Sequence, residues 1–207
     1  MEVCPTRFAE YAAPMDSDGT AHPATLSLAE ECAADVLDLL EVEPDFTADT
    51  LPLVDHYCKG LDRDPEVLER ASRTVGAYFG EVVRRRFGCR WHVSPEGSLL
   101  WRLEFERCFL YFNPVGVALE LLFEGEIPGS NATFVTWPAA TEALVPLLDR
   151  MPPVSEQDFF NLSTRFEVLE TVVDFLMARK DDKQPEIYDE RFYVTQVALF
   201  GGGDTSD

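Results

Sequence analysis

The sequence predicts an α+β protein in which a small antiparallel meander packs on one long helix, with additional helices from both termini. Three observations lead to this fold class. Residues 64–87 carry apolar side chains at helical spacing. Three apolar runs of period two follow between residues 89 and 112. The hydrophobic content of 46% in 207 residues can fill a sizeable core.

We expect one domain over residues 26–200. An irregular segment rich in proline precedes it over residues 1–25, and a flexible acidic tail follows over residues 201–207.

The first helix is expected from residue 27 to about residue 42, because Ser27 and Glu30 form a capping box. Its apolar positions at helical spacing are Leu28, Cys32, Val36, Leu39 and Leu40. Its other side is wholly acidic and carries Glu30, Glu31, Asp35, Asp38 and Glu41. Such a face is either simply solvated or a docking surface for a basic partner, and both interpretations stay open.

A short helix over residues 50–61 precedes the long one, which begins with Asp64 as N-cap and Pro65 at the first helical position. Gly76 and Gly80 lie inside the long helix, where each glycine costs about 1 kcal/mol relative to alanine. We therefore expect either another element or a ligand to approach the helix closely there, and we favour packing by another element. Gly88 ends it.

The meander is expected from strands at residues 89–93, 99–105 and 108–112. Cys89 and Trp91 would face the long helix, whereas Arg90 and His92 would face away. The sequence Asn113-Pro114 then begins a short helix through Leu122.

The C-terminal third is predicted to hold a loop with one short strand at residues 133–137, then helices over 138–149 and from 164 to about 180. The β-branched and aromatic run at residues 192–200 predicts a buried strand or a dimer contact.

The net charge of −21, from 38 acidic and 17 basic residues, argues against binding to nucleic acids and to anionic membranes. It is compatible with solubility, with steering toward a basic partner or with imitation of a polyanion.

The five cysteines suggest no disulfide framework, and the chain shows neither a signal peptide nor an apolar run long enough to span a bilayer. A cytoplasmic location is the expectation.

Catalytic and metal-binding motifs are not evident. Cys89 and His92 have the spacing of a ligand pair, but on a strand they fall on opposite faces, so we expect no metal site and no cofactor. Cys89 shares its face with Trp91, which favours a core position over a nucleophile. Glu81 is expected to form a surface ion pair with Arg84 or Arg85.

A basic cluster falls within the predicted helix and meander, at Arg84, Arg85, Arg86, Arg90, His92, Arg102 and Arg107. Three of these, Arg90, His92 and Arg102, can share the outward face of the sheet, and a ligand site there would use Glu81 or Glu120 as its acidic member. Alternatively, the cluster pairs with the chain's own acidic helix.

The segment Gly76–Trp91, taken with Asn113–Glu120, resembles a pattern in uncharacterised small bacterial α+β domains. In that pattern a helix bearing Gly-Glu and arginine leads to a Gly-x-x-Trp strand, and an Asn-Pro turn follows. The resemblance implies a fold and brings no activity or catalytic residue. Similar modules accompany bacterial toxin–immunity systems.

The leading hypothesis is a non-enzymatic cytoplasmic binding module whose acidic surface engages a basic protein, as an immunity or antitoxin-like inhibitor or a regulatory adaptor would. One alternative is an enzyme or small-ligand sensor that uses the Arg/His face. Another is a structural protein that self-assembles through a strand at residues 187–200, which leaves homo-oligomerisation open.

Overall fold

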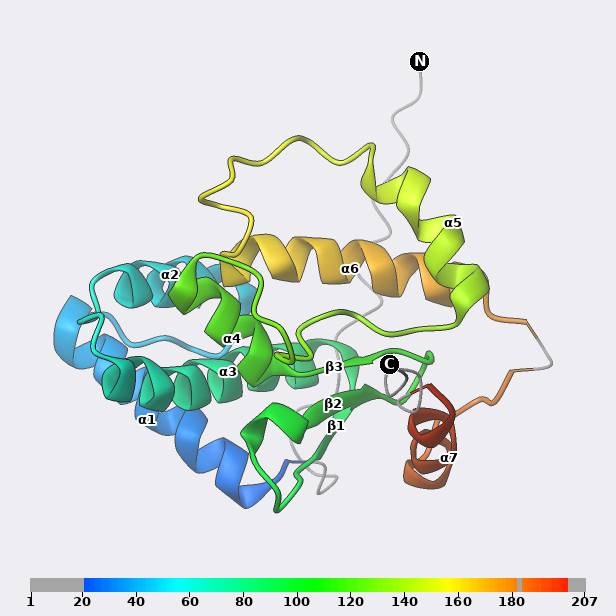
Figure 1. The fold of residues 1–207 in the computed structure, drawn as a ribbon, viewed down its shortest axis with the longest axis horizontal. Coiled ribbons are helices and arrows are strands. Elements are labelled where there is room, and N and C mark those ends of the chain that lie inside the picture. The colour runs from blue at the N-terminus through cyan, green and yellow to red at the C-terminus, as the bar shows by residue number, and fades with distance from the viewer. Residues whose placement is uncertain (1–20, 182–183, 201–207) are drawn as a thin grey trace, which may run out of the picture.

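The computed structural model describes residues 21–181 and 184–200, and these confirm the α+β fold class. In chain order the helices are α1 (Pro23–Leu40), α2 (Leu51–Lys59), α3 (Pro65–Phe87), α4 (Pro114–Phe123), α5 (Pro138–Leu148), α6 (Leu162–Ala178) and α7 (Glu190–Phe200). The strands are β1 (Cys89–His92), β2 (Arg102–Phe105) and β3 (Tyr111–Phe112). Helix α3 lies in the middle, with α1 on one side and α2, α4 and α6 on the other (Figure 1).

Helix α3 has the predicted bounds. The Asp64 side chain accepts a hydrogen bond from the backbone N–H of Glu66 at 2.8 Å, and Pro65 occupies the first turn. Gly88 ends the helix in the left-handed region, with a φ of 70°. These are the cap positions that the sequence predicts.

The two glycines of α3 permit the close approach expected of them. A Cβ added at Gly76 would lie 2.5 Å from the Cα of Val115, so α4 packs backbone to backbone against α3. A Cβ added at Gly80 would overlap the ring of Trp91. The conformational cost of glycine in the helix is therefore offset by packing against α4 and β1.

The sheet is an antiparallel meander in the order β1-β2-β3, as predicted, and its inner face packs on α3. Its second strand is shorter than expected, because residues 98–100 form a 3₁₀ turn that leaves Leu99 41% exposed. Two asparagines hold that turn: Asn113 Nδ2 donates to the carbonyl of Ser98, and Asn131 Nδ2 donates to the carbonyl of Leu99. The predicted strand at 133–137 is reduced to a single bridge between Val135 and Tyr111.

Helix α1 begins four residues before the predicted capping box. Pro23 stands in its first turn, and His22 Nδ1 accepts a hydrogen bond from the N–H of Ala24. Leu39 was expected in the apolar stripe, but it is 57% exposed. The buried stripe runs through Ala29, Cys32 and Val36, and a spacing of four continues it to Leu40.

Helix α6 begins at Leu162, two residues before the predicted start at Thr164. The reason is a distant cap. The carboxylate of Asp55 in α2 accepts hydrogen bonds from the N–H of Leu162 at 2.7 Å and of Ser163 at 3.2 Å. The Ser163 hydroxyl also donates to Asp55 at 2.7 Å.

The strand predicted at residues 192–200 is wrong, because this segment is helix α7. Asp189 begins the helix by accepting a hydrogen bond from the N–H of Phe192 at 2.9 Å. Tyr193 anchors it, since its buried hydroxyl lies 2.7 Å from the carbonyl oxygen of Phe105 and accepts from the N–H of Leu110. This tertiary contact overrides the β propensity of the run.

Candidate functional site

The acidic face of α1 is only partly neutralised within the chain. Glu31 forms an ion pair with Arg70 of α3, and Asp35 accepts a hydrogen bond from the Tyr57 hydroxyl at 3.4 Å. The three remaining members are exposed and pair with no basic side chain of the described residues: they are Glu30, Asp38 and Glu41. The available negative charge thus increases toward the C-terminal end of the helix.

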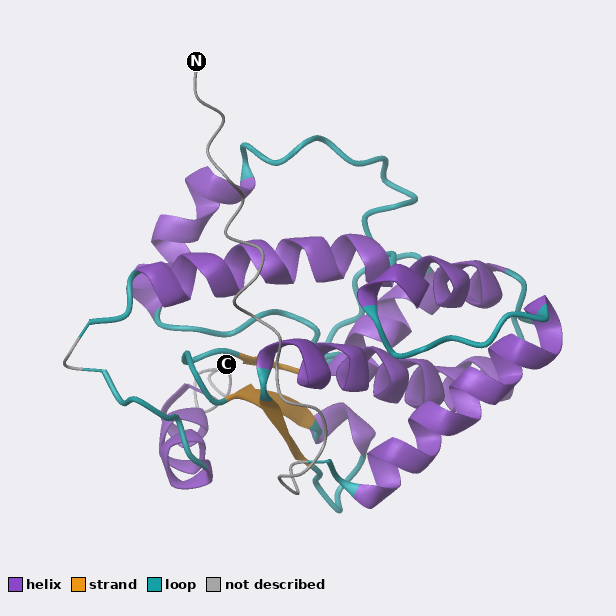
Figure 2. Cartoon of the chain, turned by 180° about the vertical axis from the view of Figure 1, so that it is seen from behind, coloured by secondary structure: helices purple, strands orange, loops and turns teal. Residues whose placement is uncertain are grey.

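Exposed apolar side chains lie among these carboxylates. Leu37 is 40% exposed, Leu39 57% and Val42 47%. Asp38 and Glu41 alternate with them, and Glu41 adopts a left-handed conformation that ends the helix. This end of α1 lies at the outer edge of the molecule (Figure 2). We refer to residues 37–43 as the α1 terminus.

The basic face of the meander is organised around a buried carboxylate. Glu104 is 1% exposed and lies beside Arg90 in the register of β1 and β2. Arg102 Nε donates to it at 2.8 Å and Arg90 Nη2 at 3.2 Å. Burial raises the pKa of Glu104, while the two guanidinium groups oppose that shift. The arginines expected to meet a ligand therefore surround a carboxylate of their own chain.

His92 lies on the same face of the sheet as Arg90 and Arg102, next to their network around Glu104. It stands opposite Arg102 in the β1–β2 register and is half-buried. Its pKa is lowered, first by burial and then by the positive charge of Arg102. At neutral pH it is therefore an uncharged ring beside two arginines.

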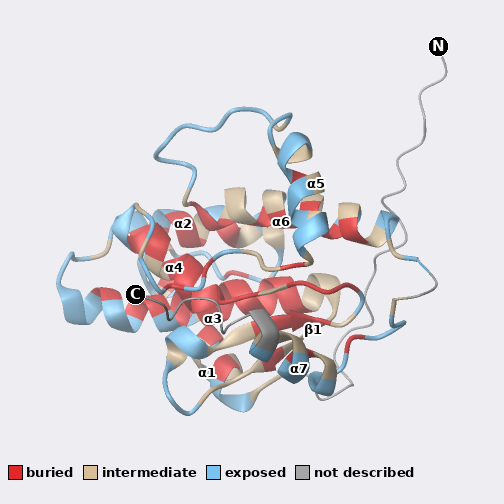
Figure 3. Cartoon of the chain, turned by 45° about the vertical axis from the view of Figure 1, so that its right-hand side comes forward, coloured by how far each residue is buried: buried red, intermediate tan, exposed pale blue. Residues whose placement is uncertain are grey.

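Glu81 does not form the surface ion pair that was expected. It is 0% exposed, and its Oε1 accepts a hydrogen bond from the indole nitrogen of Trp91 at 2.8 Å. Its Oε2 accepts from Arg84 Nε at 2.9 Å, and Arg85 Nε lies 3.9 Å away. The difference arises because α3 is buried on several sides (Figure 3), so that Glu81 and Arg84 lie in the core although their spacing is typical of a surface ion pair. Glu81 joins α3 to β1 and does not join the Arg90 and His92 face.

Glu120 pairs with α6 and not with an arginine of the meander. Arg165 Nη2 donates to it at 2.8 Å, and the Ser130 hydroxyl donates at 2.9 Å. The proposed combination of Arg90, His92 and Arg102 with Glu81 or Glu120 is therefore divided among three separate networks.

The rest of the basic cluster also has partners within the chain. Arg86 pairs with Glu170 of α6 at 3.2 Å, and Arg90 lies 3.8 Å from Glu106 as well as beside Glu104. The arginines of the cluster thus pair with acidic side chains of α3, β2 and α6, whereas the alternative interpretation expected the acidic helix. The acidic helix pairs instead with Arg70 of α3, through Glu31, and Arg70 lies outside the cluster.

The described cysteines are all buried in reduced form: they are Cys32, Cys58, Cys89 and Cys108. Burial raises the pKa of Cys108 to about 12 and raises the pKa of Cys89 well above its usual range. Cys89 accordingly has the properties of a core side chain and not of an activated nucleophile. Within residues 21–181 and 184–200, no group of three or more His, Cys, Asp or Glu side chains is arranged to hold a metal ion.

None of the described helices combines the length and the apolar character needed to cross a bilayer. Comparison of the whole chain with protein-family models, curated proteins and solved structures found no match. The resemblance to small bacterial α+β domains therefore rests on the quoted motifs alone.

Proposed function

We propose that the protein is a non-enzymatic binding module of the cytoplasm that engages a basic protein partner through the α1 terminus. One observation carries this proposal. Asp38 and Glu41 are exposed and unpaired within the described chain, next to the exposed side chains of Leu37, Leu39 and Val42.

The combination of residues favours a protein partner over simple solvation. Apolar side chains gathered in one exposed segment supply contact area, and carboxylates around them supply orientation. The net charge of −21 would speed the encounter with a basic surface and make it depend on salt. An inhibitor or a regulatory adaptor works in this way, by occupying a surface of another protein.

The pairing of the arginines within the chain supports the same proposal. Arg90 and Arg102 are committed to Glu104, which leaves the sheet face less open to an anionic ligand. The basic side chains are thus used largely for internal cohesion, whereas the excess acidic ones remain available to a partner.

Two charge-reversal variants of equal net charge test the proposal. The first carries Asp38→Lys, Glu41→Lys and Glu43→Lys, which are exposed residues of the α1 terminus. The control carries Glu142→Lys, Glu156→Lys and Glu167→Lys, which are exposed residues elsewhere. Each tagged protein would be used in a pull-down at low salt, eluted with a salt gradient and followed by mass spectrometry and association kinetics.

The expected result is a basic protein retained by the wild type and by the control, and lost by the first variant. Its association rate should fall with the first variant and lose most of its salt dependence. Equal behaviour of the two variants toward every captured protein would contradict the assignment of the α1 terminus, because only net charge would then matter.

A further inference from the structure

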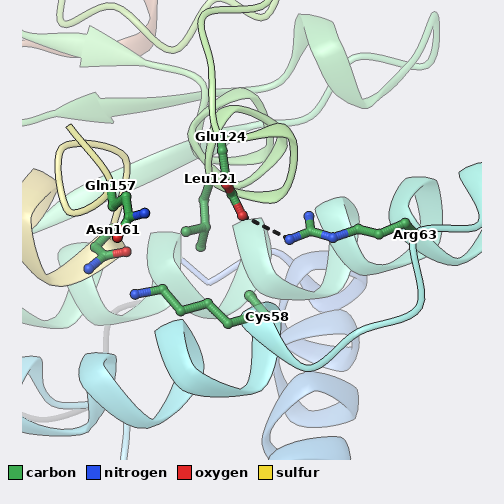
Figure 4. Close-up of a pocket in the computed structure, with 7 residues that line it drawn as sticks. Cys58, Arg63, Leu121, Glu124, Gln157 and Asn161 are labelled. Carbon is green, nitrogen blue, oxygen red and sulfur yellow. Dashed lines mark hydrogen bonds and ion pairs between the residues drawn. The ribbon is translucent and has the colours of Figure 1, made fainter.

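A pocket of about 210 Å³ opens between α2, α4 and the turn that precedes α6 (Figure 4). At about 30 Å³ per water molecule, it has room for roughly seven waters. That is less than the roughly 300 Å³ at which pockets for drug-sized ligands begin. A ligand that fills it is therefore a small molecule. None of the residues in the α1 terminus lines it.

The amide of Asn161, in the wall of this pocket, has an unused acceptor. Asn161 is only 8% exposed, and its Nδ2 donates to Asp158 Oδ1 at 3.1 Å. A carboxylate can only accept, so Asp158 determines which end of the amide faces it. The other end, Oδ1, is buried and has no hydrogen-bond donor in the described chain. A buried acceptor without a donor destabilises the folded protein, and a hydrogen bond from a ligand N–H or O–H would remove that cost.

The turn that carries Asn161 is held in place before any ligand arrives. Ser155 Oγ accepts from the N–H of Asp158 at 3.1 Å and donates to the Asp158 carboxylate at 2.7 Å. The N–H of Asn161 donates to the carbonyl of Asp158 at 3.1 Å. These bonds keep the Asn161 acceptor in position, and preorganisation of this kind lowers the cost of binding.

Positive charge stands beside the acceptor. Lys59 lines the pocket, and its Nζ lies 4.0 Å from Asp158 Oδ1, at the outer limit of an ion pair. A carboxylate that enters can therefore approach the Lys59 ammonium without breaking a close contact. The opposite wall is different, because Arg63 is bound to Glu124 at 2.8 Å and to the carbonyl of Leu122.

Figure 4 shows Asn161 and Gln157 on one side of the pocket and the ion pair of Arg63 and Glu124 on the other. Leu121 lies between them and provides an apolar wall. A ligand thus meets an acceptor and an ammonium group on one side, and a neutralised ion pair and a leucine on the other.

We propose that this pocket binds a small carboxylate with an N–H or O–H donor next to its carboxyl group, as in a free α-amino or α-hydroxy acid. Its carboxylate would meet Lys59, and its donor would meet Asn161 Oδ1 once the side chains that cover this oxygen move aside. Lys59 Nζ and Asn161 Nδ2 lie 4.0 Å and 3.1 Å from the same Asp158 oxygen, so the two side chains are neighbours in this wall and a ligand that contacts both needs its carboxylate and its donor close together.

The test compares ligands with and without the donor. Lactate carries a donor hydroxyl, and propionate has the same carbon chain and charge without it. Alanine carries an ammonium donor, which also adds a positive charge. The melting temperature and the side-chain amide signal of Asn161 in ¹H–¹⁵N spectra would be followed during titration of the whole protein. Sodium chloride at the same ionic strength is the control, since salt alone screens the repulsion of a chain with net charge −21.

Lactate or alanine should raise the melting temperature in a saturable way and shift the Asn161 signal, with propionate at least tenfold weaker. Lys59→Met should weaken the preferred acid at least tenfold, whereas Arg73→Met, an exposed site with the same loss of charge, should not. Equal responses to propionate and to the donor-bearing acids, or no response beyond that of sodium chloride, would overturn the proposal and show that the pocket holds only water.

Discussion

The carboxylate of Glu81 accepts a hydrogen bond from the indole nitrogen of Trp91 at 2.8 Å, and both side chains are buried. The bond ties the middle of α3 to β1. The second carboxylate oxygen accepts from Arg84 at 2.9 Å, so one acidic group satisfies a neutral and a charged donor.

Glu81→Gln should lower the free energy of unfolding by about 3–5 kcal/mol, because Arg84 then loses the buried negative charge with which it pairs. Chemical denaturation followed by tryptophan fluorescence measures the change. Glu167→Gln, at an exposed site of α6, serves as the control and should change stability by less than about 0.5 kcal/mol. A Glu81→Gln protein as stable as this control would show that the pair contributes little.

Gly76→Ala should also destabilise the protein, although the same change in an exposed helix usually stabilises it by about 1 kcal/mol. The new Cβ would lie 2.5 Å from the Cα of Val115, and a backbone atom cannot move aside without shifting α4. We expect a loss of about 1–3 kcal/mol, the range for overpacked cores. Thermal unfolding would measure it.

Gly60→Ala is the matched control. Its Cβ would meet only the carbonyl oxygen of Tyr57 at 3.5 Å, an ordinary contact, and Gly60 has a negative φ. If both alanine variants proved equally stable, the close packing of α3 on α4 would not be a constraint on the sequence.

Acidification toward the ordinary pKa values of carboxyl groups should stabilise the fold through Asp55 and Glu104. His92 acts in the opposite direction, because its lowered pKa makes protonation of the folded state costly as the pH falls below its ordinary 6.5. Burial raises the pKa values of Asp55 and Glu104 above their ordinary 3.8 and 4.5. The folded state therefore binds more protons than the unfolded state between the ordinary and the raised value. Stability is gained as the pH falls through the folded pKa, and the gain is complete below the unfolded one.

Denaturation midpoints across this pH range measure the effect, and Glu104→Gln removes one of its sources. That variant should show a smaller increase on acidification than the wild type. Parallel pH profiles for the two proteins would mean that the increase comes from the general loss of negative charge and not from Glu104.

Tyr193→Phe should cost about 1–3 kcal/mol, the usual penalty for leaving buried polar groups unsatisfied. The lost hydroxyl lies 2.7 Å from the carbonyl oxygen of Phe105 and 3.0 Å from that of Leu110. Hydrogen exchange should show faster opening of the hairpin between β2 and β3. Tyr111→Phe is the control, since its hydroxyl makes no hydrogen bond within the described residues. Similar exchange in both variants would argue that α7 is held by ring packing alone.

The sequence predicted those parts of the fold that depend on local signals. Asp64, Pro65 and Gly88 define α3 through cap chemistry that acts within a few residues. Asn113 likewise begins α4 by accepting from the N–H groups of Val115 and Gly116. Such signals can be recognised without knowledge of residues that are distant in the sequence.

Distant partners account for the errors. Burial of Glu81 depends on Trp91 and on the packing around α3, and the arginine for Glu120 comes from α6. In α7 the local β propensity was misleading, although Asp189 followed by Glu190 is a helix-start signal that the sequence does contain. The acidic residues of α1 were identified from their pattern, but the exposed Leu37 and Val42 beside them required the structure.

The contact between Asp55 and the start of α6 spans 107 positions of the chain. During synthesis α2 leaves the ribosome well before Leu162 does, since chains elongate at about 5–20 residues per second. Until then the Asp55 carboxylate has to stay hydrated, and α2 cannot settle into its final position. Helix α2 is therefore synthesised early but can be fully buried only after α6 has been synthesised. The N-terminal helices thus depend on the C-terminal third of the chain to complete their folding.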